Sequence, residues 1–243
     1  MTDRPRLLAL INDSSAPPAR FGDWLAAAGV DVEVLDLVGG AAVPTELPAG
    51  FAGLLPLGGG IGATDDHLAD WLPAERALLA KAVTAGQPVL GICLGGQLLA
   101  AATGGVVALG AIPELGVLPI ELTPAAATDR LFSVLPPGVR VPQFHRDGIF
   151  AAPPGAVALA HSPGYPWQGF RIGERAWGVQ FHPEVDAAIL AEWLVGEADV
   201  AKTLELEPAV VVADLAAAED EIERVWRPFA VAFAEVVSEY ARG

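Results

Sequence analysis

The only cysteine of the chain, Cys93, lies between a short apolar segment and an expected helix that starts within 97–102. Gly91 and Gly95 flank it two residues away on either side, which is the spacing of a nucleophile elbow, where larger neighbours would collide with the backbone. A thiol at a helix N-terminus also favours the thiolate form. This pattern suits a nucleophile, although a lone cysteine beside glycines is usually a small buried hydrophobic residue, so a second motif is needed.

A second segment carries residues suited to assist that thiol. Segment 178–185 ends an apolar strand with His182 and Glu184 two positions apart. If His182 lies beside Cys93 in the fold, it can act as a general base, and Glu184 can fix its tautomer and stabilise the imidazolium. Triad members commonly meet only in the fold, so their separation in sequence is expected. The two segments together predict acyl-transfer chemistry.

A glycine-rich segment, 58–66, follows the apolar strand predicted for 51–57. Acyl transfer needs backbone N–H donors directed at the developing oxyanion, and glycines let a backbone amide approach closely. Residues 58–63 also match a dinucleotide-binding fingerprint formally, but that motif requires a helix to open at once. Here the expected helix starts only near Pro73. We therefore favour the oxyanion-binding interpretation.

The two motifs together resemble the class I (triad) glutamine amidotransferase family. They are Gly-Ile-Cys-Leu-Gly-Gly-Gln at 91–97 and Gln-Phe-His-Pro-Glu at 180–184. The most similar type is a stand-alone protein related to the glutaminase domain of GMP synthetase, with the resemblance running over 58–184. It implies hydrolysis of the glutamine side-chain amide through a cysteinyl thioester, which gives glutamate and ammonia without a cofactor. The ammonia would pass to a separate synthetase or other accepting protein.

The resemblance assigns catalytic roles residue by residue. Cys93 would be the nucleophile, His182 the base and Glu184 the orienting acid. The backbone N–H groups of Gly59 and Leu94 would form the oxyanion hole.

The resemblance further implies five substrate-binding residues. Gln97 matches a glutamine that lines the pocket, and Gln168 matches the family pattern more weakly. His145 and Asp147 match a His-x-Asp element near the pocket, although such a pair in a loop can also be bonded only locally. Phe144 stands where several biosynthetic members carry a serine, which favours a ligand other than free glutamine. The four histidines lack metal-ligand spacing, so no metal is expected.

Two alternatives to a glutaminase stay open. The same triad could hydrolyse another γ-glutamyl amide or peptide. The chain could also be a non-enzymatic or redox-sensing protein on the same fold, with Cys93 as a readily oxidised thiol.

Composition narrows the range of partners. A formal charge of −16 argues against binding to nucleic-acid backbones and anionic membranes. The mean hydropathy is high, at +0.44, and segment 82–113 is uncharged, but Pro88 and several glycines break it into strand-length runs. A single cysteine excludes an internal disulfide and suits a reducing environment, so a cytoplasmic protein is expected.

The first half of the chain alternates predicted strands with predicted helices, which is typical of a doubly wound, mostly parallel, flavodoxin-like α/β sheet. The strands are expected at 6–11, 32–37, 51–57 and 89–92, and the helices at 18–28 and 73–85.

The second half has a different pattern. From about Gly105, short β segments punctuated by proline and glycine predict a small antiparallel extension; they are 106–109, 116–122, 139–144, 156–160, 169–172 and 176–181. A helix is expected over 215–240, with Pro228 as a break or a start. We expect one amidotransferase-like domain over 1–243, with a core of about 5–195 and a helical extension over 200–243.

Overall fold

The structure, a computed structural model, describes residues 4–243 and is built around an eight-stranded mixed sheet. Four pairings, from β2 through β1, β3 and β4 to β10, are parallel, and β9, β8 and β6 then continue the sheet antiparallel. In spatial order the strands are β2 (Asp31–Asp36), β1 (Arg6–Ile11), β3 (Phe51–Pro56), β4 (Val89–Ile92), β10 (Ala176–Val179), β9 (Tyr165–Ile172), β8 (Val157–Ser162) and β6 (Glu121–Leu122). The predicted mostly parallel sheet with an antiparallel extension is confirmed.

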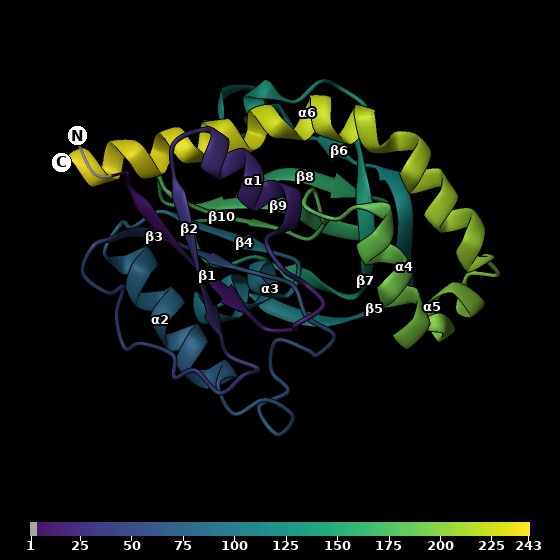
Figure 1. Ribbon diagram of the computed structural model, residues 1–243, viewed down its shortest axis with the longest axis horizontal. Coiled ribbons are helices and arrows are strands. Elements are labelled where there is room, and N and C mark those ends of the chain that lie inside the picture. Colours follow the sequence, from purple (N-terminus) through teal and green to yellow (C-terminus); the bar gives the residue numbers. More distant parts are fainter. Residues whose placement is uncertain (1–3) are drawn as a thin grey trace.

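Helices cover both faces of this sheet, with α1 and α6 on one side and α2 and α3 on the other (Figure 1). Alternate side chains of β1 explain the two layers, because successive strand residues point to opposite faces. Leu7 and Ala9 join the core under α1 and α6, whereas Leu8 and Leu10 join the core under α2 and α3. The helices are α1 (Ala19–Ala27), α2 (Leu72–Thr84), α3 (Leu94–Ala102), α4 (Ala187–Gly196), α5 (Ala198–Thr203) and α6 (Pro208–Arg242).

A separate two-stranded ribbon pairs β5 (Val106–Pro119) with β7 (Arg140–Ala151). The predicted division of β5 at 110–115 and the predicted end of β7 at Phe144 are both wrong. The ribbon accommodates Gly110 and Pro113 because its register shifts between Leu109 and Glu114, which is the behaviour of a β-bulge. Consequently His145 and Asp147 lie on a strand and not in a loop.

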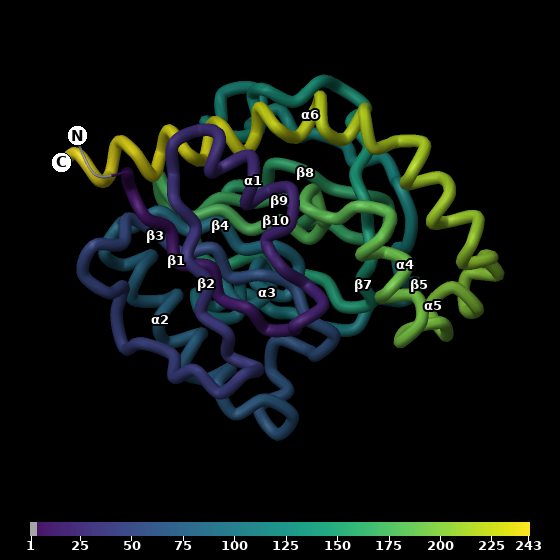
Figure 2. The backbone as a smooth tube through the Cα atoms, in the orientation of Figure 1, coloured from purple at the N-terminus to yellow at the C-terminus, as the bar shows by residue number. Residues whose placement is uncertain are grey.

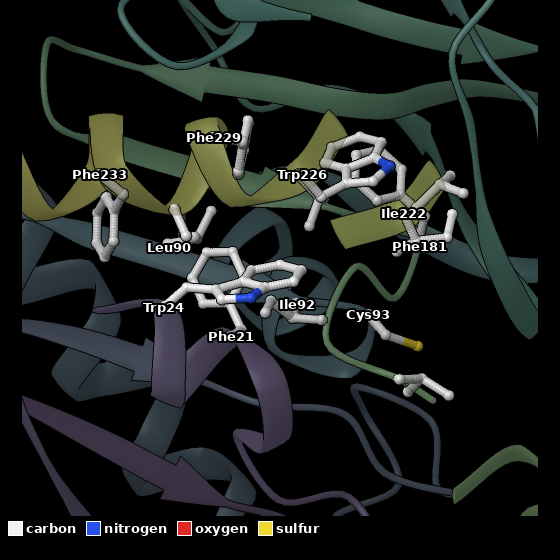
Figure 3. Packing of buried hydrophobic residues seen from close by; sticks show 14 of the residues in the cluster. Phe21, Trp24, Leu90, Ile92, Cys93, Phe181, Ile222, Trp226, Phe229 and Phe233 are labelled. Atoms are coloured by element: carbon white, nitrogen blue, oxygen red, sulfur yellow. The ribbon is translucent and has the colours of Figure 1, made fainter. Parts of the chain in front are cut away.

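The C-terminal helix α6 is continuous over 35 residues and passes through Pro228, so the predicted break or start at that proline is wrong. A proline inside a helix destabilises it by about 3 kcal/mol, whereas each large apolar side chain that is fully buried stabilises the folded state by roughly 1.5–3 kcal/mol. Trp226, Phe229 and Phe233 are fully buried on the sheet and on α1 (Figure 3). The helix therefore stays intact because its packed face outweighs one lost hydrogen bond.

Helices α4 and α5 connect the sheet to the start of α6, which then runs back across the molecule (Figure 2). Asp186 caps α4 by accepting a hydrogen bond from the Ile189 N–H at 2.9 Å. In the part of the chain that the structure describes, no helix, α6 included, is long and apolar enough to cross a membrane.

Candidate active site

Cys93 occupies a sharp turn between β4 and α3, with φ +51° and ψ −110°, a conformation rare for residues other than glycine. The turn is possible only with small neighbours. A Cβ atom on Gly91 would lie 2.4 Å from the carbonyl oxygen of Gly95, and one on Gly95 would lie 2.0 Å from that of Pro56. The glycines predicted to permit the elbow are therefore required by direct backbone contact. In Figure 3 the Cys93 sulfur points away from the aromatic core.

His182 reaches the same place from the neighbouring strand. Because β4 and β10 are adjacent and parallel, their carboxyl ends bring Cys93 and the segment after Val179 together. His182 donates from Nδ1 to Oε1 of Glu184 at 2.7 Å, and both residues are buried. A Cβ atom on Gly58 would lie 3.1 Å from His182 Cε1 and 3.9 Å from Cys93 Cβ, so both side chains border this glycine.

The charge state of His182 is set by its neighbours. Burial alone would lower the pKa of the imidazole, but the Glu184 carboxylate and the hydrogen-bonded sulfur of Cys93 raise it to about 10. The proton is thus retained on the imidazole at neutral pH. This arrangement favours an imidazolium hydrogen-bonded to Glu184.

The two predicted oxyanion donors lie side by side. Leu94 is the first residue of α3, where a backbone N–H has no acceptor within the helix. A Cβ atom on Gly59 would come within 2.9 Å of Leu94 Cδ2, which places the glycine loop directly against the start of α3. Within residues 4–243 neither N–H donates a hydrogen bond. Neither amide is therefore committed to an acceptor within the described residues, and their role as oxyanion donors stays a prediction.

A cavity of about 500 Å³ brings most of the predicted site residues together. Glu184 and Leu94 do not line the cavity: Glu184 is bonded to His182 on its far side, and Leu94 directly follows Cys93 in the chain. The predicted residues that line the cavity are Gly59, Cys93, Gln97, Phe144, His145, Asp147 and His182.

Gln168 is the predicted substrate-binding residue that the structure places elsewhere. It is fully buried, accepts a hydrogen bond from Gln143 Nε2 at 2.9 Å, and donates to Ser162 Oγ at 3.1 Å and to Glu114. It does not line the cavity. Its amide instead helps to hold Glu114, which lies behind the site.

His145 is fixed on both sides of its ring. Nδ1 lies 2.8 Å from the Asp147 carbonyl oxygen and Nε2 lies 2.9 Å from Glu114 Oε2. Burial would raise the pKa of Glu114, but hydrogen bonds from His145 and Ser162 lower it. Asp147 is half-buried, and burial together with the Asp65 carboxylate raises its pKa. The His-x-Asp element is therefore bonded locally and also borders the cavity, and its role in substrate binding stays a prediction.

Two residues of the site were not predicted from the sequence. Trp193 of α4 lies with its ring centre 4.8 Å from that of His182 and 5.7 Å from that of Phe144. No sequence motif marks Trp193, because it reaches the site only through the packing of α4 in the folded protein. Gln180 donates from Nε2 to the Cys93 sulfur at 3.6 Å, and its signal was present in the Gln-Phe-His-Pro-Glu motif.

The charged side chains that line the cavity are mostly acidic. Arg146, the one arginine among the residues that line the cavity, forms ion pairs with Glu197 and, at 3.0 Å, with Asp199. Asp13 and Asp65 also line the cavity. Among the residues described, no group of three or more His, Cys, Asp or Glu could hold a metal ion.

Comparison with known families identifies the fold and the motifs. The family model of "Glutamine amidotransferase class-I" matches residues 25–190. The chain belongs to this family. The match spans the elbow, the glycine loop and the His-Pro-Glu segment.

Proteins of similar sequence agree with membership of this family. A glutamine-hydrolyzing GMP synthase of Aeropyrum pernix is 33% identical over 145 residues, which are 58% of this chain and 28% of that protein. A second relative, from Pyrococcus abyssi, is one subunit of a glutamine-hydrolyzing GMP synthase. It is 40% identical over 99 residues, which are 40% of this chain and 51% of that protein. These matches thus span about half or less of the relatives' length.

Solved structures match over nearly the whole chain. A glutamine amidotransferase from Thermotoga maritima superposes with a TM-score of 0.83 at 25% identity, covering 96% of this chain and 99% of that one. A glutamine amido transferase from Methylobacillus flagellatus gives a TM-score of 0.81 at 28% identity, covering 97% of this chain and 95% of that one. The likeness therefore includes the long C-terminal helix.

Proposed function

We propose that this amidotransferase hydrolyses the side-chain amide of glutamine through a thioester on Cys93 and releases glutamate and ammonia. One observation carries the proposal. The Cys93 thiol, the His182 imidazole bonded to Glu184 and the glycine loop at Gly59 border one cavity, and Leu94, whose N–H has no acceptor in residues 4–243, directly follows Cys93. This combination supplies a nucleophile, a proton carrier and an oxyanion site, which are the parts that acyl transfer needs.

In the first half of the reaction the Cys93 thiolate attacks the γ-carbonyl carbon. The negative charge that develops on the carbonyl oxygen is stabilised by the Gly59 and Leu94 N–H groups. His182 is bonded to Glu184 through Nδ1, which leaves Nε2 to give its proton to the departing nitrogen. The C–N bond breaks, ammonia leaves, and the acyl group remains on sulfur.

In the second half, water attacks the thioester. Neutral His182 now accepts a proton from the water through Nε2, and the same two amides stabilise the second oxyanion. The C–S bond breaks, glutamate leaves, and the thiolate–imidazolium pair is restored. Glu184 keeps Nδ1 protonated throughout and so holds one tautomer.

We further propose that the ammonia is consumed by a separate protein. The relatives named GMP synthase extend well beyond the segment that they share with this chain. This supports a synthetase-type partner as the acceptor, without defining which synthetase. Free L-glutamine turnover without the partner can then be slow.

A second substrate class is favoured by Phe144. Its ring packs 5.7 Å from Trp193, which itself contacts His182, so the cavity wall near the base is aromatic. An apolar wall suits a larger γ-glutamyl amide or peptide better than the polar end of free glutamine. The catalytic steps would be unchanged, with an amine leaving in place of ammonia.

The test is glutamate release from L-glutamine by the purified protein beside Cys93→Ala and Phe144→Ser. Labelling with a γ-glutamyl diazo-ketone, followed by intact mass, detects the thioester-competent site even when turnover is slow. We expect turnover or labelling that Cys93→Ala abolishes. A folded protein that neither reacts with the diazo-ketone nor hydrolyses a panel of γ-glutamyl amides would contradict the proposal. Ready peroxide oxidation of Cys93 in such a protein would favour the redox-sensing alternative.

A further inference from the structure

The side-chain amide of Gln180 contacts the sulfur that performs the proposed chemistry. Gln180 follows β10 and is 1% exposed. Its Nε2 lies 3.6 Å from Cys93 Sγ, within the range of a hydrogen bond to sulfur. The proposed mechanism gives roles to the general base and the oxyanion donors, but it does not use this contact.

The orientation of this amide is fixed by a chain of hydrogen bonds. The backbone carbonyl of Asp147 can only accept, so the Gln97 Nε2 that lies 3.3 Å from it must be the nitrogen end of that amide. Gln97 Nε2 also donates to Gln180 Oε1 at 3.1 Å. With its oxygen directed to Gln97, Gln180 must present its NH₂ group to Cys93.

An N–H donor at sulfur acts differently on the two forms of cysteine. A thiol is a weak acceptor, whereas a thiolate is an anion that accepts a charge-assisted hydrogen bond. A hydrogen bond to the charged form favours ionisation, so the donor adds to the effects of the α3 N-terminus and the His182 imidazolium. Because the Gln180 amide does not titrate, its N–H donor is present at every pH.

We propose that Gln180 is a further catalytic residue, which donates a hydrogen bond to the Cys93 thiolate, and that Gln97 is the positioning residue that orients it. The inference rests on the proposed role of Cys93 as nucleophile. It also predicts that Gln97 acts on the nucleophile through Gln180, in addition to bordering the cavity.

The experiment measures the thiol itself. The rate of Cys93 alkylation by iodoacetamide is followed by intact mass between pH 4 and pH 10, in about half-unit steps, for wild type, Gln180→Met and Gln180→Glu. Methionine keeps the volume and removes the donor, and we expect the midpoint to rise by about one pH unit. Glutamate adds a like charge beside sulfur, and we expect a larger rise.

Two further variants separate orientation from packing. Gln97→Met leaves Gln180 free to turn, so we expect a smaller upward shift of the same midpoint. The matched control is Gln143→Met, because Gln143 is also 1% exposed but lies outside the cavity and bonds to Gln168. We expect it to keep the wild-type midpoint. If Gln180→Met fails to fold by circular dichroism, Gln97→Met against Gln143→Met decides the question.

A wild-type midpoint in folded Gln180→Met or, if that variant is unfolded, in Gln97→Met would overturn the inference. The alkylation profile needs no substrate, so it is read independently of turnover. A shifted midpoint in a protein that hydrolyses no γ-glutamyl amide would retain the role of Gln180 at the thiol and reject the proposed function. Normal turnover with an unshifted midpoint would support the proposed function and reject the role of Gln180 at the thiol.

Discussion

His182 donates from Nδ1 to Oε1 of Glu184 at 2.7 Å, and only Pro183 separates the two residues in the chain. Their side chains are 3% and 2% exposed, so the carboxylate acts on the imidazole without screening by water. A buried ion pair is strongly dependent on both partners, because removing one leaves the other charge unpaired. The high pKa of His182 therefore depends directly on the charge of Glu184.

The first prediction is that Glu184→Gln lowers kcat by at least about 100-fold, by analogy with the loss of the orienting carboxylate in other triads. The amide keeps the volume but removes the charge, so the pKa of His182 falls from about 10 towards its ordinary value of 6.5. We measure kcat and the rate of Cys93 alkylation as functions of pH. The midpoint of the alkylation profile should move to higher pH in Glu184→Gln. Asp186→Asn is the control, since asparagine still caps α4. Unchanged kcat in Glu184→Gln would remove Glu184 from the mechanism.

A second prediction concerns Gly58. A Cβ atom there would lie 3.1 Å from His182 Cε1, so Gly58→Ala must displace the imidazole by a few tenths of an ångström. Small displacements of catalytic groups cost up to about 100-fold in rate, and we expect a loss of about 10- to 100-fold in kcat. On the same loop Gly60→Ala meets only ordinary contacts at 3.8 Å, so its rate should stay near wild type.

For this pair of variants, kcat and the thermal midpoint are measured together. A fall in the midpoint of Gly58→Ala that matches its fall in rate would indicate general damage instead of a displaced base. Equal rates for the two variants would show that the imidazole tolerates the added methyl group.

A third prediction follows from a buried carboxyl behind the glycine loop. Glu75 is fully buried, and burial raises its pKa from 4.5 to about 7 against the opposing hydrogen bond from Asn12 at 3.2 Å. Its other oxygen has no partner in residues 4–243. The folded state thus binds more protons than the unfolded state between pH 4.5 and 7, and stability falls as pH rises through this window.

Glu75→Gln removes that titration while keeping an oxygen for the Asn12 amide. Relative to wild type, the variant should gain up to about 3 kcal/mol in unfolding free energy at pH 8 and nothing from this source at pH 4. Urea unfolding at both pH values measures the difference, and Glu174→Gln, at an exposed position, is the control. A gain of the same size at both pH values would refute the linkage.

The local parts of the candidate site could be predicted from the sequence because the proposed chemistry imposes short-range spacing. Cys93 needs glycines two residues away, and His182 needs a carboxylate within reach, so both patterns are visible in a few positions. The parallel strands were visible for a similar reason, since each is a short buried apolar run. Gln168 also has the right residue type, but whether it borders the cavity or lies behind it depends on strand packing that no local pattern encodes.

The remaining features depend on distant contacts. The bulge that keeps β5 continuous depends on pairing with β7, which the sequence alone does not show. The predicted interruption of the strand near Pro113 is therefore wrong. Trp193 enters the site only because α4 packs beside His182. The predicted break or start of the helix at Pro228 is likewise wrong. Local helix rules count the hydrogen bond lost at a proline but not the buried aromatic face of α6 that compensates for it.

The last prediction tests that balance. Pro228 lies inside α6, where its ring removes one backbone hydrogen bond, whereas Pro208 lies in the first turn of the same helix, where no such bond exists. Pro228→Ala should therefore stabilise the protein by about 1–3 kcal/mol, reduced by the greater freedom of the unfolded chain. Pro208→Ala should change stability by less than about 0.5 kcal/mol. Both are measured by urea unfolding, with far-ultraviolet circular dichroism for helix content. A destabilised Pro228→Ala would mean that a bend at this proline fits α6 to the twisted sheet, and that the proline is required for the packing of Trp226 and Phe229.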